Sequence, residues 1–286
     1  MGCRSEDNAK EAIEHIRNDV TVSEGELRWL PLDLSTVIKA RESAKRFLGM
    51  EDKLDVLVNN AVVQVQLGQG EFSLNDDGIE TMMAVNHIGH FVFTTALLDL
   101  MKHTSSREGS DVRIVVVSSI VRALPAWTNP KLSFSNLSEL SKPFPVNNTN
   151  TWFNQVVRYG RSKLANHLFA SELQSRLEAE GSNIIVVCLH PGNVTTSAAV
   201  NSVGKMPVWS LISSSILRLA FVNEVEGARN SVFAATSPVI RAEPDKYKGK
   251  YLMPIGKVTT PSKMALDVKL AKQLWTLSEV IVESKG

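Results

Sequence analysis

The residues best suited to chemistry lie close together in the second half of the chain, where Tyr159 is followed four positions later by Lys163. On an α-helix this spacing places both side chains on one face, one turn apart. A neighbouring ammonium favours the phenolate, so we expect Lys163 to lower the pKa of Tyr159 from roughly 10 toward neutrality. Such a tyrosine can give a proton to a carbonyl oxygen or take one from an alcohol. Because Tyr-x-x-x-Lys is a weak pattern alone, the surrounding sequence must support it.

The composition is that of an ordinary globular protein, with 43% hydrophobic and 21% charged residues and a formal net charge of +1 over 286 residues. A charge this small, without a basic stripe or an acidic tail, argues against nucleic acid and membrane surfaces as partners. The two cysteines, Cys3 and Cys188, are far apart and lack metal-ligand spacing, so we expect no metal site and a reducing compartment. We therefore expect a cytoplasmic protein.

The chain also lacks the sequence features of membrane insertion. Its first residues contain no apolar core, so we expect no signal peptide. The longest apolar stretch, about 208–222, contains four serines and an arginine and is shorter than the roughly 20 residues of a spanning helix. We expect no transmembrane segment.

Apolar runs rich in β-branched residues alternate with amphipathic segments along the chain. This alternation predicts an α/β protein with a parallel sheet that is covered by helices on both faces. A long segment from 118 to about 152 is expected to be irregular. Strands are expected at 26–32, 54–58, 113–117, 183–189 and 250–253, and helices at 8–18, from the N-cap Ser35 to 47, at 74–101, around Tyr159 to about 178, at 224–236 and at 262–283.

Polar residues follow the carboxyl ends of these strands, which is the edge where open α/β sheets bind ligands. We expect one crevice at this edge, with Tyr159 facing into it. The residues expected to line it are Asp33, Asn59, Ser119, Pro191 and Gly192.

Six motifs occur in an order that resembles the short-chain dehydrogenase/reductase family, and the resemblance covers nearly the whole chain. The motifs are Asp33-Leu34, Asn59-Asn60-Ala61, Val85-Asn86-His87-Ile88-Gly89-His90-Phe91, Val117-Ser118-Ser119, Tyr159-x-x-x-Lys163 and His190-Pro191-Gly192 through Thr196. The forms around Asn86, Ser162 and His190 are similar to the retinol-dehydrogenase and WW-domain-oxidoreductase branch. The segments 249–254 and 270–275 resemble its fungal members.

The resemblance implies a Rossmann-like doubly wound fold and a role for each matching residue. Tyr159 would be the general acid/base, and Lys163 would bind the nicotinamide ribose. Ser119 would hydrogen-bond the substrate oxygen, and Asn86 would hold a water that links Lys163 to solvent. The hydride chemistry would belong to the nicotinamide.

The remaining implied contacts are with the cofactor. Asp33 would contact the adenine, and Arg4 suits a 2′-phosphate, which favours NADP(H) over NAD(H), although NAD remains possible. Val194 and Thr196 would contact the nicotinamide amide. The other expected cofactor-binding residues are Leu34, Asn59, Asn60, Ala61, Pro191 and Gly192.

Each of these residues has a simpler interpretation. Asn86 is also consistent with a hydrogen-bonded core residue, Asp33 with a helix cap, and Ser119 with a turn residue, in which case Ser118 would be the reactive serine. His87, His90 and His190 are interpreted as structural residues.

Two departures from the family pattern stand out. Val62 occupies the position of a family glycine that lets the backbone pass close to the cofactor. The glycine-rich loop Thr-Gly-x-x-x-Gly-x-Gly does not occur in the sequence. We therefore expect one NAD(P)-binding domain over 1–286 whose first β-α-β unit, roughly 30 residues, is absent, so that the sheet is truncated at its N-terminal side.

The predicted function is an NADP(H)-dependent oxidoreductase that interconverts a lipophilic alcohol and its ketone or aldehyde. The apolar segment 196–222 favours a lipophilic substrate. The alternatives are a non-catalytic pseudoenzyme, an interaction module, or an inactive truncated product. The resemblance also implies a possible homodimer, paired through the helices that carry Asn86 and Tyr159.

Overall fold

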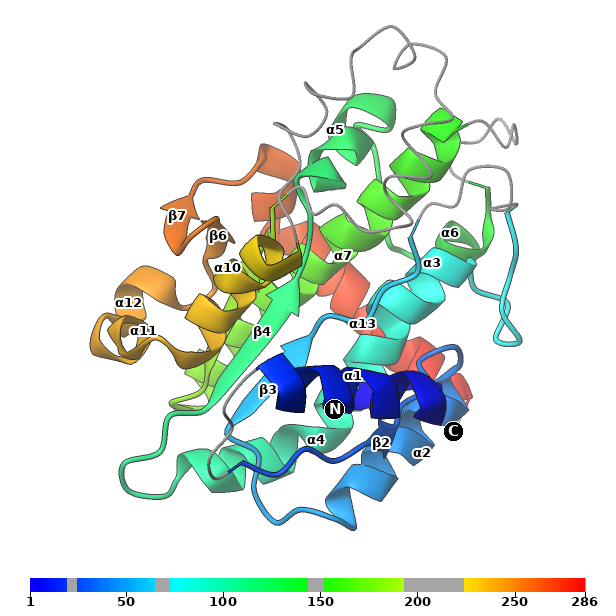
Figure 1. Cartoon of the computed structure of the whole chain (residues 1–286). Helices are drawn as coiled ribbons and strands as arrows, with labels where there is room; N and C mark the ends of the chain where they lie inside the picture. Colours follow the sequence, from blue (N-terminus) through cyan, green and yellow to red (C-terminus); the bar gives the residue numbers. More distant parts are fainter. Residues whose placement is uncertain (20–24, 65–71, 144–151, 193–223, 286) are drawn as a thin grey trace, which may run out of the picture.

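The computed structural model describes residues 1–19, 25–64, 72–143, 152–192 and 224–285. Its larger sheet has the strand order β3-β4-β5-β6-β7 (Figure 1). The first four strands are parallel, and β7 is antiparallel to β6. The strands are β3 (Val56–Asn59), β4 (Arg113–Val117), β5 (Ile185–Leu189), β6 (Tyr251–Met253) and β7 (Lys257–Thr259).

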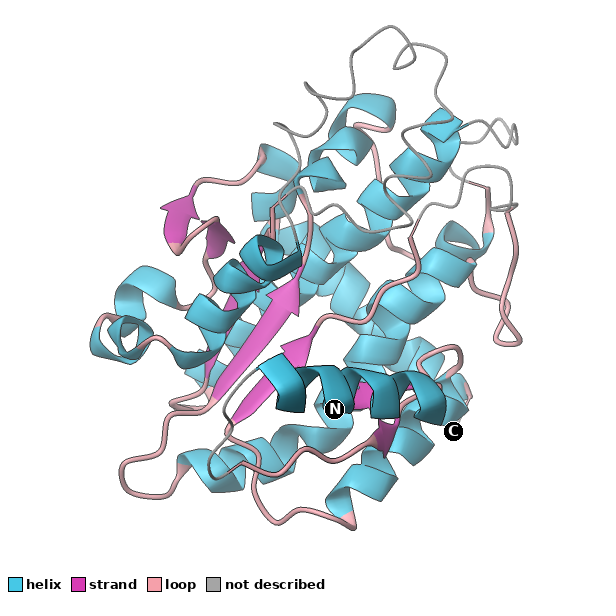
Figure 2. Cartoon of the chain, viewed as in Figure 1, coloured by secondary structure: helices cyan, strands magenta, loops and turns pink. Residues whose placement is uncertain are grey.

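Helices cover both faces of this sheet, as a doubly wound fold requires (Figure 2). Alternate residues of β4 and β5 point to opposite faces, and both strands are buried throughout. One face packs mainly on α4 (His90–Ser105), α7 (Trp152–Ala179) and α13 (Val268–Ser284). The other packs on α10 (Glu224–Thr236), α11 (Pro238–Ala242) and α12 (Pro244–Tyr247). The α/β Rossmann-like prediction is confirmed.

A second, smaller sheet pairs β1 (Gly2–Cys3) with β2 (Leu30–Pro31) in parallel. Within the described ranges no strand joins it to the larger sheet. The edge strand β3 leaves Val58 40% exposed, in contrast to the fully buried β4. The expected absence of a central strand stays a prediction. The predicted strand 26–32 is reduced to two residues because β1 offers only two residues to pair with.

The remaining helices are short or lie outside the sheet layers. None of the helices in the described part of the chain is long and apolar enough to cross a lipid bilayer. They are α1 (Glu6–Asp19), α2 (Val37–Leu48), α3 (Thr81–Met83), the π-helix η1 (Ala84–Gly89), the 3-10 helix η2 (Ile120–Ala123), α5 (Leu124–Thr128), α6 (Ser138–Ser141) and the 3-10 helix η4 (Lys263–Leu266).

Two helix starts differ from the prediction. Thr36, and not Ser35, is the N-cap of α2, because its side chain accepts the Lys39 amide. The helix predicted from 74 begins only at Thr81. Asn75 accepts the amides of Asp77 and Ile79, and Gly78 has φ 77°, so this stretch forms a turn before the helix. The segment expected to be irregular contains η2, α5 and α6.

Helix α13 lies across α4 and α7 on the apolar face that those two helices share. Trp275 stacks on Phe169, with ring centroids 5.9 Å apart, and meets Phe91 edge-on at 5.0 Å. The side chain of His87 hydrogen-bonds Ser278 at 3.0 Å. This face is the one through which a homodimer was expected to pair. Because α13 occupies it, pairing by that route would require α13 to move.

Candidate active site

The helix α7 brings Tyr159 and Lys163 to the carboxyl end of β4. Lys163 is 2% exposed, and its Nζ donates to the carbonyl oxygen of Val117 at 2.9 Å. In return, the Ser118 hydroxyl donates to the Lys163 carbonyl oxygen at 2.7 Å. Tyr159 is only half-buried. The last residues of β4 therefore hold this turn of α7 in place.

The electrostatics of the pair differ from the prediction. Burial lowers the pKa of Lys163 to about 8. Burial raises the pKa of the Tyr159 phenol, whereas the sequence predicted a lowered value. The physical reason is the position of the ammonium. It is hydrogen-bonded to Val117 and lies 5.7 Å from the centroid of the Tyr159 ring, so desolvation dominates.

Ser119 lies in a turn that packs directly on the Tyr159 turn. Its hydroxyl accepts the amide of Val121 at 3.4 Å and caps η2. A Cβ at Gly160 would lie 2.5 Å from the carbonyl oxygen of Val121, so only glycine permits this approach. Ser118 is 1% exposed and its hydroxyl is used by α7. Of the two serines, Ser119 is the more exposed, and its hydroxyl also has the capping role.

Asn86 is fully buried in the π-helix η1, the kind of local distortion often found at functional sites. Its side chain accepts the amide of Val63 at 2.7 Å and donates to the Val63 carbonyl at 3.1 Å. Its second amide hydrogen goes to the Ser162 hydroxyl at 2.9 Å. The main-chain oxygen of Asn86 pairs with Nδ1 of His90 at 3.1 Å. The side chain thus acts as a clamp, and the simpler reading of a hydrogen-bonded core residue describes it in this structure.

Ser162 completes this connection and was not recognised as a site residue in the sequence. Its hydroxyl accepts from Asn86 and donates to the Tyr159 carbonyl oxygen at 2.8 Å. The segment after β3, the helix η1 and the Tyr159 turn are therefore joined through three side-chain hydrogen bonds. Its position between Tyr159 and Lys163 was the sequence feature from which it could have been recognised.

The residues that follow β3 divide into two kinds. Asn59 is 3% exposed and its amide donates to Thr94 at 2.8 Å, so its side chain supports α4. Asn60 and Ala61 are exposed and open to a ligand. Leu34 is 4% exposed and belongs to the hydrophobic core, so its side chain is a packing residue.

Arg4 and Asp33 lie at the carboxyl ends of β1 and β2, which run in parallel. Arg4 is exposed. Asp33 accepts the Ser35 amide at 2.9 Å and pairs with Lys39 at 3.2 Å. Burial alone would raise the pKa of Asp33, but these bonds outweigh it and hold the pKa below its usual range. The acceptance of the Ser35 amide is also consistent with the simpler capping interpretation.

The two sheets meet where Leu34 touches η1. A Cβ on Gly89 would lie 2.5 Å from the Leu34 carbonyl oxygen. Three residues before Gly89, Asn86 holds Val63 just beyond the end of β3. The carboxyl ends of β2 and β3 therefore converge on η1, although no ladder among the described residues joins their sheets.

Pro191 and Gly192 are half-buried and directly follow β5. Gly192 has φ 106°, a conformation that favours glycine. The preceding carbonyl of His190 accepts the amide of Asn230 at 2.7 Å, which ties the end of β5 to α10. Val194, Thr196 and the apolar segment 196–222 lie outside the described residues.

A buried cluster of Arg122, His167 and Tyr251 lies next to this site and was not recognised in the sequence analysis. The Arg122 guanidinium lies 3.6 Å from the centroid of the Tyr251 ring, and its main-chain amide donates to Ser119 at 3.2 Å. The His167 and Tyr251 rings are 5.3 Å apart. Spacing alone hinted at it, because Arg122 is three residues after Ser119 and His167 four after Lys163. Among the described residues, no cluster of His, Cys, Asp and Glu could hold a metal ion.

Comparison with known proteins agrees with this arrangement. The family described as short chain dehydrogenase matches residues 2–130. A short chain dehydrogenase/reductase, dpchH, of the fungus Colletotrichum higginsianum is 36% identical over 288 residues, covering 100% of this chain and 69% of the relative. Retinol dehydrogenase 14 of Homo sapiens is 33% identical over 300 residues, covering 99% of this chain and 78% of that protein.

The fold also matches solved structures. An uncharacterized protein from Mycobacterium paratuberculosis superposes with a TM-score of 0.65 at 26% identity, covering 99% of this chain and 83% of that one. Sequence and fold thus point the same way. The chain belongs to the short-chain dehydrogenase/reductase family, whose members are oxidoreductases that act on alcohols and carbonyl compounds with NAD(P).

Proposed function

We propose that this protein interconverts a lipophilic alcohol and its ketone or aldehyde by hydride transfer, with NADP(H) as the cofactor. The observation that carries the proposal is the convergence of three side chains on one turn of α7. Tyr159 is half-buried there, Lys163 is anchored to the end of β4, and the Ser119 turn packs on the neighbouring Gly160. Nothing in this arrangement favours a purely structural role, since a buried ammonium is costly.

The residues present fit two parts of the proposed cofactor. Arg4 is an exposed cation at the end of β1 and would pair with a 2′-phosphate. Lys163 and Tyr159 would hold the nicotinamide ribose. The sequence has no glycine-rich strand-to-helix turn of the kind that binds a pyrophosphate. The fit to the cofactor therefore rests on the 2′-phosphate at Arg4 and the nicotinamide ribose at Lys163 and Tyr159.

The nicotinamide, when bound, supplies or accepts the hydride. In the reducing direction, the Ser119 hydroxyl donates a hydrogen bond to the substrate carbonyl oxygen and orients it. Tyr159 gives its phenolic proton to that oxygen as the hydride reaches the carbon, which yields the alcohol. The Lys163 ammonium stabilises the phenolate that remains. With its pKa raised by burial, Tyr159 is protonated at neutral pH, as the reducing direction requires.

The lipophilic substrate class rests on the apolar sequence 196–222 and on the relative named retinol dehydrogenase 14, whose name assigns it a lipophilic alcohol. We also propose that residues 1–286 form one domain. The contact of Leu34 with Gly89 and the bond from Arg41 to the Val282 carbonyl oxygen at 3.1 Å support it, because they join the N-terminal part to η1 and α13.

The test is the replacement Tyr159→Phe, which deletes the transferable proton and almost no volume. We expect kcat to fall by about 10²- to 10⁴-fold with an unchanged melting temperature. Tyr247→Phe, a buried tyrosine on α12, is the matched control and should keep full turnover. A panel that runs from small polar ketones to retinoid-sized carbonyls is assayed with NADPH and with NADH. Turnover of Tyr159→Phe within a few-fold of the parent would refute the catalytic assignment, and a preference for small polar ketones would refute the substrate class.

A further inference from the structure

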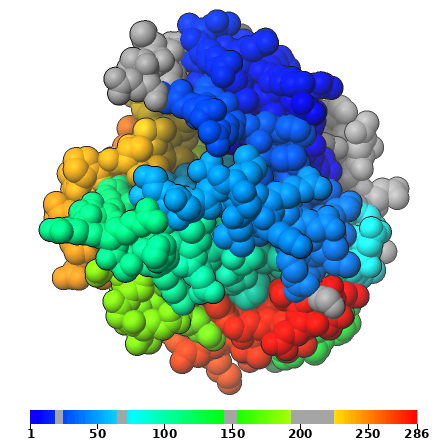
Figure 3. Space-filling model, turned by 90° about the horizontal axis from the view of Figure 1, so that it is seen from below, coloured from blue at the N-terminus to red at the C-terminus, as the bar shows by residue number. Residues whose placement is uncertain are grey.

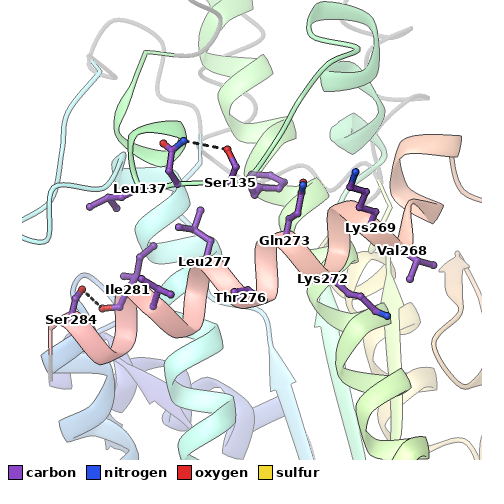
Figure 4. Close-up of a pocket in the computed structure, with 13 residues that line it drawn as sticks. Ser135, Leu137, Val268, Lys269, Lys272, Gln273, Thr276, Leu277, Ile281 and Ser284 are labelled. Atoms are coloured by element: carbon purple, nitrogen blue, oxygen red, sulfur yellow. Dashed lines mark hydrogen bonds between the residues drawn. The ribbon is translucent and has the colours of Figure 1, made fainter.

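A groove runs along the outer side of α13, away from the residues of the candidate active site. Its volume is about 950 Å³, and its second wall is the segment from Phe134 to Leu137. Figure 4 shows α13 crossing the view, with Gln273 and Leu277 pointing toward Ser135 and Leu137 of the second wall. From below, α13 forms part of the molecular surface (Figure 3). This groove is separate from the site built around Tyr159.

One face of the helix α13 packs on the rest of the protein, and another face lines the groove. Trp275 packs on Phe91 of α4 and Phe169 of α7, and Ser278 hydrogen-bonds His87 of η1. The groove face repeats every three or four residues, as one side of an α-helix does. Its members are Val268, Lys269, Lys272, Gln273, Thr276, Leu277, Val280, Ile281 and Ser284. The face is therefore continuous from the first to the last turn of α13.

The floor of the groove is apolar, and so is much of its rim. Phe134, Leu277 and Ile281 are 1%, 6% and 2% exposed and form the floor. Leu137 and Val280 are 39% and 54% exposed and remain open to a ligand at the rim. Such a surface gains free energy when an apolar group covers it.

The charged side chains that line the groove are all positive. Lys269 and Lys272 both lie in the first half of α13, and no Asp or Glu lines the groove. Both lysines are exposed, and neither has an ion-pair partner within the residues that the structure describes. A ligand with a single anionic end and an apolar body would match this asymmetry.

The dimensions of the groove suit an acyl chain. From Val268 to Ser284 the helix rises about 24 Å at 1.5 Å per residue. A groove of that length with a volume of about 950 Å³ has room for one extended acyl chain.

We propose that this groove binds a free long-chain carboxylate. The carboxylate pairs with Lys269 and Lys272, and the acyl chain lies over Leu277 toward Ile281. This assignment is independent of the catalytic proposal, because no residue of the groove belongs to the candidate active site.

The experiment is calorimetric titration of the full chain with dodecanoate below its micellar concentration, with dodecanol as the uncharged match. We expect saturable binding of one dodecanoate. The double variant Lys269→Gln/Lys272→Gln should weaken dodecanoate about tenfold and leave dodecanol unchanged. The matched control Lys250→Gln/Lys257→Gln removes the same charge from exposed lysines near β6 and β7 and should bind like the parent.

A second variant tests whether the acyl chain runs through the middle of the groove. Thr276 is exposed in the middle of the groove, so Thr276→Trp fills it without disturbing the core and should also reduce dodecanoate binding about tenfold. Circular dichroism and the melting temperature report whether each variant folds. No saturable binding of dodecanoate, or equal binding by parent and lysine variants, would overturn the proposal. Cosedimentation with anionic phosphatidylglycerol vesicles that Thr276→Trp abolishes would identify a membrane surface instead, and would overturn it as well.

Discussion

The carboxamide nitrogen of Asn86 lies 2.9 Å from the hydroxyl of Ser162, although 76 positions separate the two residues in the chain. Through this bond the π-helix η1 is joined to the helix that carries Tyr159. Because Asn86 also holds both backbone polar groups of Val63, a single side chain sets the position of the segment after β3 relative to the Tyr159 turn. The two expected halves of the site, for cofactor and for proton transfer, are thus mechanically linked.

Ser162→Ala is expected to destabilise the fold by about 1–3 kcal/mol, because it leaves a buried amide hydrogen of Asn86 without an acceptor. Urea unfolding measures the change. Ser106→Ala is the control, since the Ser106 hydroxyl makes a similar bond to the His103 carbonyl oxygen but is exposed. Equal stability of Ser162→Ala and the parent would show that the hydrogen bond between Asn86 and Ser162 does not stabilise the fold.

Gly89→Ala is expected to destabilise the protein by about 1–3 kcal/mol through overpacking. The added Cβ would lie 2.5 Å from the Leu34 carbonyl oxygen and 2.6 Å from the Leu34 Cβ. Alanine is otherwise the better helix former by about 1 kcal/mol, so a gain in stability would contradict the close approach of the two sheets. Gly49→Ala, where the nearest atom is 3.5 Å away, is the matched control and should be neutral. Thermal unfolding of both variants is the measurement.

Lys163→Met is expected to abolish turnover and yet stabilise the fold at neutral pH. Burial lowers the pKa of Lys163 from 10.5 to about 8, so the charged form costs about 3 kcal/mol in the folded state. Loss of the hydrogen bond to Val117 costs about 1–1.5 kcal/mol. The free energy of unfolding should therefore rise by a net amount of about 1–2 kcal/mol.

The sign of the pH dependence follows from the same lowered pKa. Between pH 10.5 and about 8 the unfolded chain binds a proton that the folded chain does not, so the parent loses stability as the pH falls through this window. The advantage of Lys163→Met should therefore be full at pH 7 and smaller at pH 9.5. Urea unfolding at both pH values tests it, with the exposed Lys257→Met as control. An advantage that is equal at both pH values would argue against a buried charge.

Tyr251→Phe and Tyr251→Leu are expected to behave differently. The Tyr251 hydroxyl is buried and has no hydrogen-bond partner among the described residues, so Tyr251→Phe should be neutral or slightly stabilising. Tyr251→Leu removes the ring beneath the Arg122 guanidinium and should cost about 2–4 kcal/mol. It should also lower kcat/KM, since Arg122 is bonded to Ser119. A similar loss in both variants would mean that the hydroxyl, and not the ring, is the important group.

Local elements followed from the sequence where their pattern was strong. The bounds of β4 and α10 agree with the predictions of 113–117 and 224–236, because an unbroken β-branched run and local helix propensity depend on neighbouring residues alone. The helix around Tyr159 was expected to run to about 178 and ends at Ala179, and the family was predicted from the order of its motifs. These features need no knowledge of what lies across the core.

The tertiary structure alone decided which group each side chain meets. Lys163 bonds to Val117, 46 positions away, and burial raises the pKa of Tyr159, where the spacing had predicted a lowered value. Asn59 supports α4, Leu34 is packed into the core, and α13 covers the face where pairing was expected. Hydrogen-bond partners and desolvation depend on how distant segments pack. Residue type and spacing determine what a side chain can do, and the surrounding packing determines what it does.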